Sequence, residues 1–199
     1  MSQPSENTRR GAALAGHVGD TAAARRFLDH PDPAVRSTAL GALARLGQVT
    51  AADLRSASVD SGPEVRRRVA EIVAAHDPGP SVSLLGLLTD ADATVVEVAA
   101  WASGEREVPE TGIVATLSTL ALEHDDALCR EAAVAALGAI GNPDGLPAIL
   151  AATTDKATVR RRAIIALAPF DGPEVDAALR QALTDRDWQV RQAAEDLLG

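Results

Sequence analysis

One short pattern occurs six times in this chain, and this repetition constrains the fold more than any other feature. In its complete form the pattern is Asp, two residues, an apolar residue and Arg, as in Asp32-Pro-Ala-Val35-Arg36, followed by Ala and Leu at helical spacing. The Arg position or its equivalent falls at residues 36, 66, 96, 130, 160 and 191, so successive copies lie 30, 30, 34, 30 and 31 residues apart. Such a period is typical of a solenoid, in which each unit packs against its neighbours.

Each repeat is predicted to contain two antiparallel helices. After Arg130 the apolar residues follow at offsets of 3, 4, 7 and 10, which form one face of a helix, and Gly141 supplies the C-terminal signal. This pattern places the second helix of each repeat just after the Asp. We expect the shorter first helices at residues 22–28, 51–57, 81–88, 113–122, 146–152 and 174–183.

An additional half repeat is expected at the N-terminus. Arg10 and the pair Ala13-Leu14 match Arg36 and the pair Ala39-Leu40, so this helix would cover the apolar flank of the first full repeat. The prediction is an all-α solenoid of about six two-helix repeats, with about twelve or thirteen helices. Residues 1–8 are expected to be disordered, and residues 9–199 to form a single solenoid domain.

The repeat resembles a known family. Residues 126–141 and 32–47 follow the pattern Asp-x-x-Val-Arg-x-x-Ala-x-x-x-Leu-x-x-Ile-Gly, allowing apolar exchanges. This pattern is similar to HEAT repeats, and within them to the short bacterial subtype named after phycobilin (PBS) lyases. The resemblance covers about residues 10–199. It implies an armadillo-like right-handed superhelix whose second helices line a concave side, with protein binding as its commonest use.

Charge and composition argue against several classes of partner. The formal net charge is −9, which disfavours nucleic acids and anionic membrane surfaces, since both need a basic footprint. No apolar run approaches the length of a membrane span, and the N-terminus lacks the apolar segment of a secretory signal. Cys129, the single cysteine, is expected in the core. We therefore expect a cytoplasmic protein that binds another protein, as a monomer.

The sequence carries no catalytic or metal-binding signature. Its four histidines lack the spacing of metal ligands, and no His-Glu dipeptide is present, which excludes a close match to the HEAT-like di-iron enzyme deoxyhypusine hydroxylase. Aromatic residues make up only 2% of the chain, which disfavours a site for a flat cofactor. We expect a non-enzymatic scaffold without cofactor or metal. The alternatives are a lyase-like protein that handles a tetrapyrrole, as the resemblance implies, and a regulatory subunit of an enzyme complex.

The repeated arginines form a predicted ladder with two interpretations. They could present a basic stripe to an acidic partner, or each could bond the Asp at a neighbouring helix start, where an Asp also caps the helix. Because the spacing follows the repeat, the structural interpretation is favoured. The ladder comprises Arg36, Arg66, Arg130, Arg160 and Arg191, with Asp32, Asp60, Asp92, Asp126 and Asp187.

Two Arg triplets extend beyond the ladder. The repeat needs only the first residue of each, which leaves Arg67, Arg68, Arg161 and Arg162. These four could form two anion-binding patches, although a solvated helix face is the favoured interpretation.

Repeat three departs from the pattern, with Val96 at the Arg position and Trp101 on the second helix. An exposed Trp101 beside Glu97, Glu105 and Arg106 would anchor a partner, because binding hot spots favour Trp and Arg. Equally, Trp101 could fill a gap left by small residues. The other tryptophan, Trp188, is expected to pack against the fold.

Overall fold

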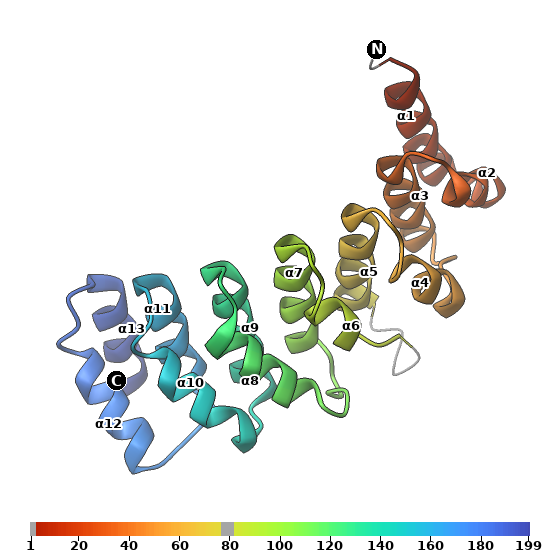
Figure 1. The fold of residues 1–199 in the computed structure, drawn as a ribbon. Coiled ribbons are helices and arrows are strands. Elements are labelled where there is room, and N and C mark those ends of the chain that lie inside the picture. The colour runs from red at the N-terminus through yellow and green to blue at the C-terminus, as the bar shows by residue number, and fades with distance from the viewer. Residues whose placement is uncertain (1–2, 77–81) are drawn as a thin grey trace. The chain divides into compact units, whose positions relative to one another are not determined.

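The computed structural model describes residues 3–76 and 82–199, and these residues form thirteen α-helices and no strand (Figure 1). The first helix is followed by six helix pairs, which confirms the predicted all-α repeat organisation. The chain divides into two compact units, Met1–Leu87 and Leu88–Gly199, and the division falls within the first helix of repeat three. We call them unit 1 and unit 2. The expectation of a single domain over residues 9–199 stays a prediction.

Unit 1 contains the N-terminal helices, which pack through small side chains. Ala12 packs with Val35 and Ala39, and Ala15 lies in a second cluster with buried residues of the same neighbouring helix. The elements are α1 (Gln3–Val18), α2 (Thr21–Arg26) with a 3-10 turn (Phe27–Asp29), α3 (Pro33–Arg45), α4 (Ala51–Ala57), α5 (Pro63–His76) and α6 (Leu85–Leu88), whose last residue begins unit 2.

Helix α1 is the predicted half repeat, but its register differs from the expectation. Its buried residues include Ala12 and Ala15, whereas Leu14 is 56% exposed, so the register differs from the match of Ala13-Leu14 to the next repeat. The reason is a close approach at Gly16, where an added Cβ would lie 2.6 Å from the Cβ of Ala42. The helix begins at Gln3, and the expected disorder of residues 1–8 stays a prediction.

Unit 2 stacks helices in two layers, with α7, α9, α11 and α13 packed in chain order in one of them (Figure 1). Leucine, isoleucine and alanine side chains fill the space between the layers, including the fully buried Leu117, Leu137, Ile149 and Ile164. The elements are α7 (Ala93–Gly104), α8 (Ile113–Glu123), α9 (Ala127–Ile140), a 3-10 turn (Pro143–Gly145), α10 (Leu146–Ala152), α11 (Ala157–Ala166), α12 (Pro173–Ala182) and α13 (Trp188–Leu198).

The helix boundaries follow local signals in the sequence. Helices α4 and α10 match the expected ranges 51–57 and 146–152 residue for residue. Helix α6 is shorter than the expected range 81–88 and begins at Leu85, whose N–H donates to the Ser83 hydroxyl. Residue 81 lies outside the described residues.

The second helix of four repeats begins at an aspartate cap. In each case one carboxylate oxygen accepts the N–H two residues further on at 2.9 Å, which satisfies a donor that the helix itself leaves unpaired. The four caps are Asp32, Asp92, Asp126 and Asp187.

Candidate functional site

Consecutive repeats are joined by an arginine that bonds in two directions, which we call a rung. In the rung of Arg130, Nε and Nη2 donate to the two carboxylate oxygens of Asp155 at 2.6 and 2.8 Å. The third nitrogen, Nη1, donates to the backbone carbonyls of His124 at 2.6 Å and Asp125 at 3.0 Å. The guanidinium thus ties the turn of its own repeat to the turn of the next.

The same rung occurs in both units. Arg36 donates to both oxygens of Asp60 at 2.8 and 2.6 Å, and Arg160 donates to both oxygens of Asp185 at 2.8 Å. These side chains are only 7–15% exposed. The hydrogen bonds from arginine hold the pKa of the Asp60 and Asp185 carboxyls below its ordinary value. The ladder arginines therefore have partners within the protein.

The identity of the rung acids corrects one prediction. Asp32, Asp92, Asp126 and Asp187 are expected both to cap helices and to pair with ladder arginines. The caps are confirmed, but Arg36, Arg130 and Arg160 pair with other acids. A cap turns its carboxylate toward its own helix, so the rung uses a different acid, at the end of the preceding first helix. Of these acids we had anticipated Asp60 but neither Asp155 nor Asp185. Their signal is the spacing, five or six residues before an Arg position.

Two further ladder arginines donate to a backbone carbonyl in the turn before their own helix. Arg66 donates to the carbonyl of Asp60 and Arg191 to the carbonyl of Asp185, both at 2.7 Å. This backbone contact is the part of the rung that Arg36, Arg66, Arg130, Arg160 and Arg191 share.

Repeat three has no such rung toward repeat four. Val96 stands at the Arg position, and His124 stands at the position six residues before the next Arg, where Asp60 and Asp185 supply the carboxylate. The ring Nδ1 of His124 accepts the N–H of Asp126 at 3.0 Å. A cavity of about 580 Å³ lies here, lined by both residues. Repeat three therefore lacks the Arg of the rung, and repeat four lacks a carboxylate six residues before its Arg, although Asp125 lies five residues before it.

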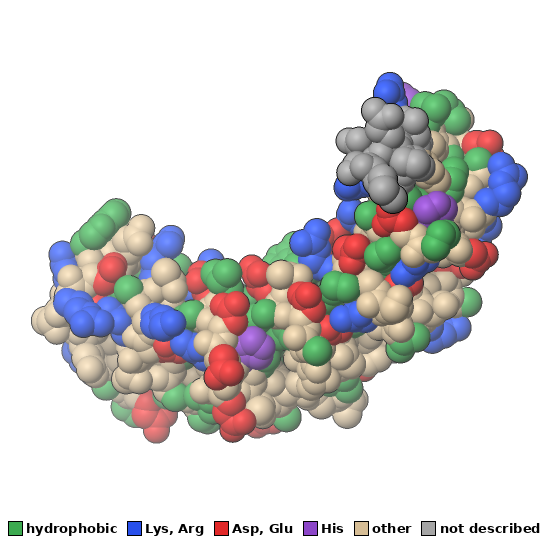
Figure 2. Space-filling model, turned by 45° about the horizontal axis from the view of Figure 1, so that its top comes forward, with side chains coloured by type: hydrophobic (Ala, Val, Ile, Leu, Met, Phe, Trp, Pro, Cys, Tyr) green, Lys and Arg blue, Asp and Glu red, His purple; other side chains and the backbone are tan. Residues whose placement is uncertain are grey.

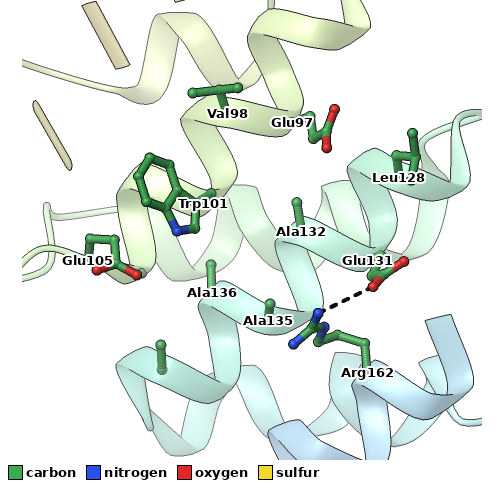
Figure 3. Close-up of a pocket in the computed structure, with 12 residues that line it drawn as sticks. Glu97, Val98, Trp101, Glu105, Leu128, Glu131, Ala132, Ala135, Ala136 and Arg162 are labelled. Carbon is green, nitrogen blue, oxygen red and sulfur yellow. Dashed lines mark hydrogen bonds and ion pairs between the residues drawn. The ribbon is translucent and has the colours of Figure 1, made fainter. Parts of the chain in front are cut away.

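A larger groove lies on the outer face of the second helices in unit 2, which we call the Trp101 groove. It measures about 640 Å³ and lies over α7, α9 and α11. Trp101 is 48% exposed on α7 with Glu105 beside it, and alanines of α9 line the same groove (Figure 3). An added Cβ at Gly104 would lie 3.0 Å from the Cα of Ala136, so this glycine brings α7 close to the alanine-lined floor.

Charged side chains border the Trp101 groove. Glu97 lies on α7 and Glu105 directly follows its last residue, and Glu131 on α9 accepts a hydrogen bond from Arg162 of α11 at 3.4 Å (Figure 3). The structure therefore brings together four predicted candidates: Trp101, Glu97, Glu105 and Arg162. Glu131 and the alanine floor were not anticipated, because their contribution depends on how α9 stacks beside α7.

Arg106 does not belong to this groove. Its side chain is only 3% exposed and forms an ion pair with Glu110 at 3.6 Å. Helix α7 ends at Gly104, and the chain that follows turns Arg106 into the fold. The expectation that Arg106 is available to a partner was wrong.

The other tryptophan is also at the surface. Trp188, expected to pack, is 64% exposed at the start of α13. It lines a cavity of about 440 Å³ with Arg161 and Ile165 of α11. Figure 2 shows basic side chains gathered near the C-terminal end of this unit.

The remaining candidates lie in unit 1. Arg67 and Arg68 both approach Glu71, at 3.4 and 2.5 Å. Arg68 also lines a groove of about 420 Å³ with Arg9, Arg10 and Arg45 of α1 and α3. Of this cluster only Arg68 was among the predicted candidates, because the four arginines lie in three different repeats.

Several other features bear on the chemistry available. Cys129 is buried, and desolvation raises the pKa of its thiol to about 11, which makes it a poor nucleophile. In residues 3–76 and 82–199, no group of three or more His, Cys, Asp or Glu side chains is placed to hold a metal ion. Over the same residues, no helix has the length and apolar character needed to cross a membrane.

Comparison with solved structures shows the same fold in several repeat proteins. An engineered protein matches at 21% identity with a TM-score of 0.65, covering 90% of this chain and 97% of its own. The Escherichia coli protein YibA matches at 17% identity with a TM-score of 0.66, covering 100% of this chain and 75% of its own. A designed armadillo repeat protein, solved with the peptide (KR)4, matches at 17% identity with a TM-score of 0.52, covering 97% and 89%.

These neighbours confirm the predicted α-solenoid. No curated protein matches the chain in sequence. The family model described as HEAT repeats matches residues 80–168 and 114–199, which together make up more than half of the chain. With its paired helices and repeated rungs, the chain belongs to the HEAT-repeat family.

Proposed function

We propose that this protein is a non-enzymatic scaffold or adaptor that binds another protein. The binding surface is the solvent-facing side of its second helices, which in a HEAT solenoid lines the concave side. The observation that carries the proposal is Trp101, a large aromatic side chain left 48% exposed over an alanine-lined groove. Burying its exposed apolar surface against a partner would be favourable.

The surroundings of Trp101 support this role. Interface hot spots are enriched in Trp, and they combine a central aromatic contact with a polar rim. Glu97 and Glu105 provide such a rim beside the indole. The alanine floor leaves the backbone of α9 accessible to close approach by a partner segment. A designed armadillo repeat protein of similar fold was solved in complex with the peptide (KR)4, so a helix array of this kind can bind a peptide.

The test compares two truncations. Proteins captured from the native organism on the immobilised chain are identified by mass spectrometry, and the affinity of the chosen partner is measured by titration calorimetry. Trp101→Ala should weaken binding by at least about 2 kcal/mol, or about thirtyfold, with an unchanged circular dichroism spectrum. Leu122→Ala, which truncates a 51% exposed side chain on α8 in the other layer, is the control and should have little effect. Equal effects of the two variants, or unfolding of the Trp101 variant, would refute the proposal.

The finer resemblance to the PBS-lyase subtype is a separate proposal, supported by the repeat pattern alone. It predicts a role in handling a tetrapyrrole, for which Trp101 offers one stacking surface in the groove. A saturable spectral shift of bilin or haem with one-to-one stoichiometry would favour this alternative over the scaffold. A regulatory subunit of an enzyme complex is a third possibility, and it would copurify with that enzyme.

Two related predictions accompany the proposal. The protein is expected to be cytoplasmic and monomeric, and to bind neither nucleic acid nor membranes. Fractionation of the native organism tests the location, and light scattering after size exclusion tests the monomer.

A further inference from the structure

Unit 1 contains a groove of about 420 Å³ across α1, α3 and α5, which we call the arginine groove. Four arginines line it together with an alanine, a threonine and a glycine, and none of the lining residues is acidic. The arginines are Arg9, Arg10, Arg45 and Arg68. Such a concentration of positive charge is unexpected in a chain whose net charge is −9.

Two glycines let the arginines lie across neighbouring helices. An added Cβ at Gly41 would lie 3.4 Å from Nε of Arg68, so the stem of this α5 side chain passes over α3. An added Cβ at Gly16 would lie 3.0 Å from Nη2 of Arg45, so that guanidinium reaches from α3 to α1. Both side chains are therefore held along the helices that form the groove.

The positive charge in this groove is largely uncompensated. Within the described part of the chain, Arg9, Arg10 and Arg45 take part in no ion pair or hydrogen bond through their side chains. Arg68 meets Glu71 through Nη1 at 2.5 Å, but its buried Nε has no acceptor. Guanidinium groups that line one groove repel one another, Glu71 offsets this only at Arg68, and a bound anion would relieve the remaining repulsion. The planar donors of arginine match the two oxygens of a carboxylate.

We propose that the arginine groove binds an acidic segment of a partner protein, with its Asp and Glu carboxylates on Arg45 and Arg68. Protein is favoured over nucleic acid because no aromatic side chain lines the groove to stack on bases, and because the rest of the chain is acidic. This site is independent of Trp101, which lies in unit 2.

The probe is fluorescein-labelled octaglutamate, titrated with the full chain at low salt and followed by anisotropy. Saturable one-to-one binding is expected, and Arg45→Ala/Arg68→Ala should weaken it at least tenfold. The control Arg26→Ala/Arg55→Ala removes the same charge from exposed positions of unit 1 outside the groove. It should change the affinity less than twofold. Equal weakening by the two double variants would mean that only the overall charge matters, and would overturn the proposal.

Two further arms keep the test independent of charge and of the other groove. Gly41→Leu retains every arginine but fills the floor beneath Arg68, and it too should weaken octaglutamate binding at least fivefold while the melting temperature is maintained. Trp101→Ala should leave this affinity unchanged. Unaltered binding by Gly41→Leu would show that no built groove is involved. Thymidine octanucleotide binding as tightly as octaglutamate would contradict the choice of a protein partner.

Discussion

Unit 1 and unit 2 use the same arginine rung between repeats but present different second-helix faces. In unit 1 this face carries the arginine groove, in which Arg45 and Arg68 lie across their neighbours. In unit 2 it carries the half-exposed Trp101 over alanines, with glutamates at the border. The contrast separates positions that hold the solenoid together from positions that are free to take up function.

In repeats two and three, the positions one, two and five residues after the Arg position lie on this face. They hold Arg67, Arg68 and Glu71 in repeat two, but Glu97, Val98 and Trp101 in repeat three. The chemistry of these positions changes from repeat to repeat, whereas the Arg position changes once. Face positions keep exposed surface even where they reach a neighbouring helix, as Arg162 does at Glu131, whereas a rung arginine is almost wholly used in joining two repeats. Stacking of the repeats therefore constrains the rung positions and leaves the face positions to vary.

The largest expected effect tests whether the rung is structural in both units. Arg130→Ala leaves the half-buried Asp155 carboxylate without its guanidinium and should lower the free energy of unfolding by about 2–3 kcal/mol. Arg36→Ala should do the same in unit 1, since Arg36 binds Asp60 in the same way. Urea denaturation followed by circular dichroism measures both losses.

The control for this comparison is Arg67→Ala. The Arg67 side chain is 44% exposed and meets Glu71 at 3.4 Å, so its loss should cost below about 0.5 kcal/mol. Equal denaturation midpoints for Arg67→Ala and Arg130→Ala would mean that the rung contributes nothing special to stability.

A second prediction concerns the missing rung in repeat three. Val96→Arg alone places an unpaired charge at a position that is 1% exposed, and it should destabilise the protein. His124→Asp supplies a carboxylate at the position equivalent to Asp60, and the double variant should recover about 1–2 kcal/mol of the loss. A double-mutant cycle in urea measures this coupling. Simple additivity would show that Val96 and His124 are not a replaced rung.

The sequence predicted the helix positions well and the residues of the second-helix face poorly, because helix signals are local and contacts between repeats are not. Helix periodicity and cap residues are local signals, so α4 and α10 were placed to the residue. The rung acids Asp155 and Asp185 were missed because the nearer cap, such as Asp187, looked like the obvious partner. Arg106 was placed on the surface because nothing local shows that the chain turns inward after Gly104. The arginine groove needs three helices to be stacked before it exists.

The third prediction is a dependence of stability on acid pH, which arises from the rungs. The hydrogen bond from Arg130 holds the pKa of Asp155 below its ordinary value. Because the folded-state pKa is lowered, the stabilisation is fully present above the unfolded pKa of about 3.9 and is lost as pH falls through the folded value. Asp155→Asn should therefore flatten the decline of unfolding free energy below about pH 4.

The matched control for the pH series is Asp144→Asn, which removes an exposed carboxylate from the turn before α10. No arginine among the described residues pairs with Asp144. Its acid profile should follow that of the unaltered chain, and a profile flattened as much as in Asp155→Asn would assign the acid sensitivity to general charge repulsion.

The smallest expected effects have opposite signs in the two faces. Arg45→Ala removes one of several converging guanidiniums in unit 1, so it should leave stability unchanged or raise it by a few tenths of a kcal/mol. Glu131→Ala removes the partner of Arg162 in unit 2, so it should lower stability by a similarly small amount. Added salt screens both interactions, because the Debye length falls to about 4–5 Å in 0.5 M sodium chloride. Both differences in stability should therefore shrink at this salt concentration. A clear loss of stability from Arg45→Ala would instead make its guanidinium part of the packing between α3 and α1, and the arginine groove would then be a structural feature of unit 1.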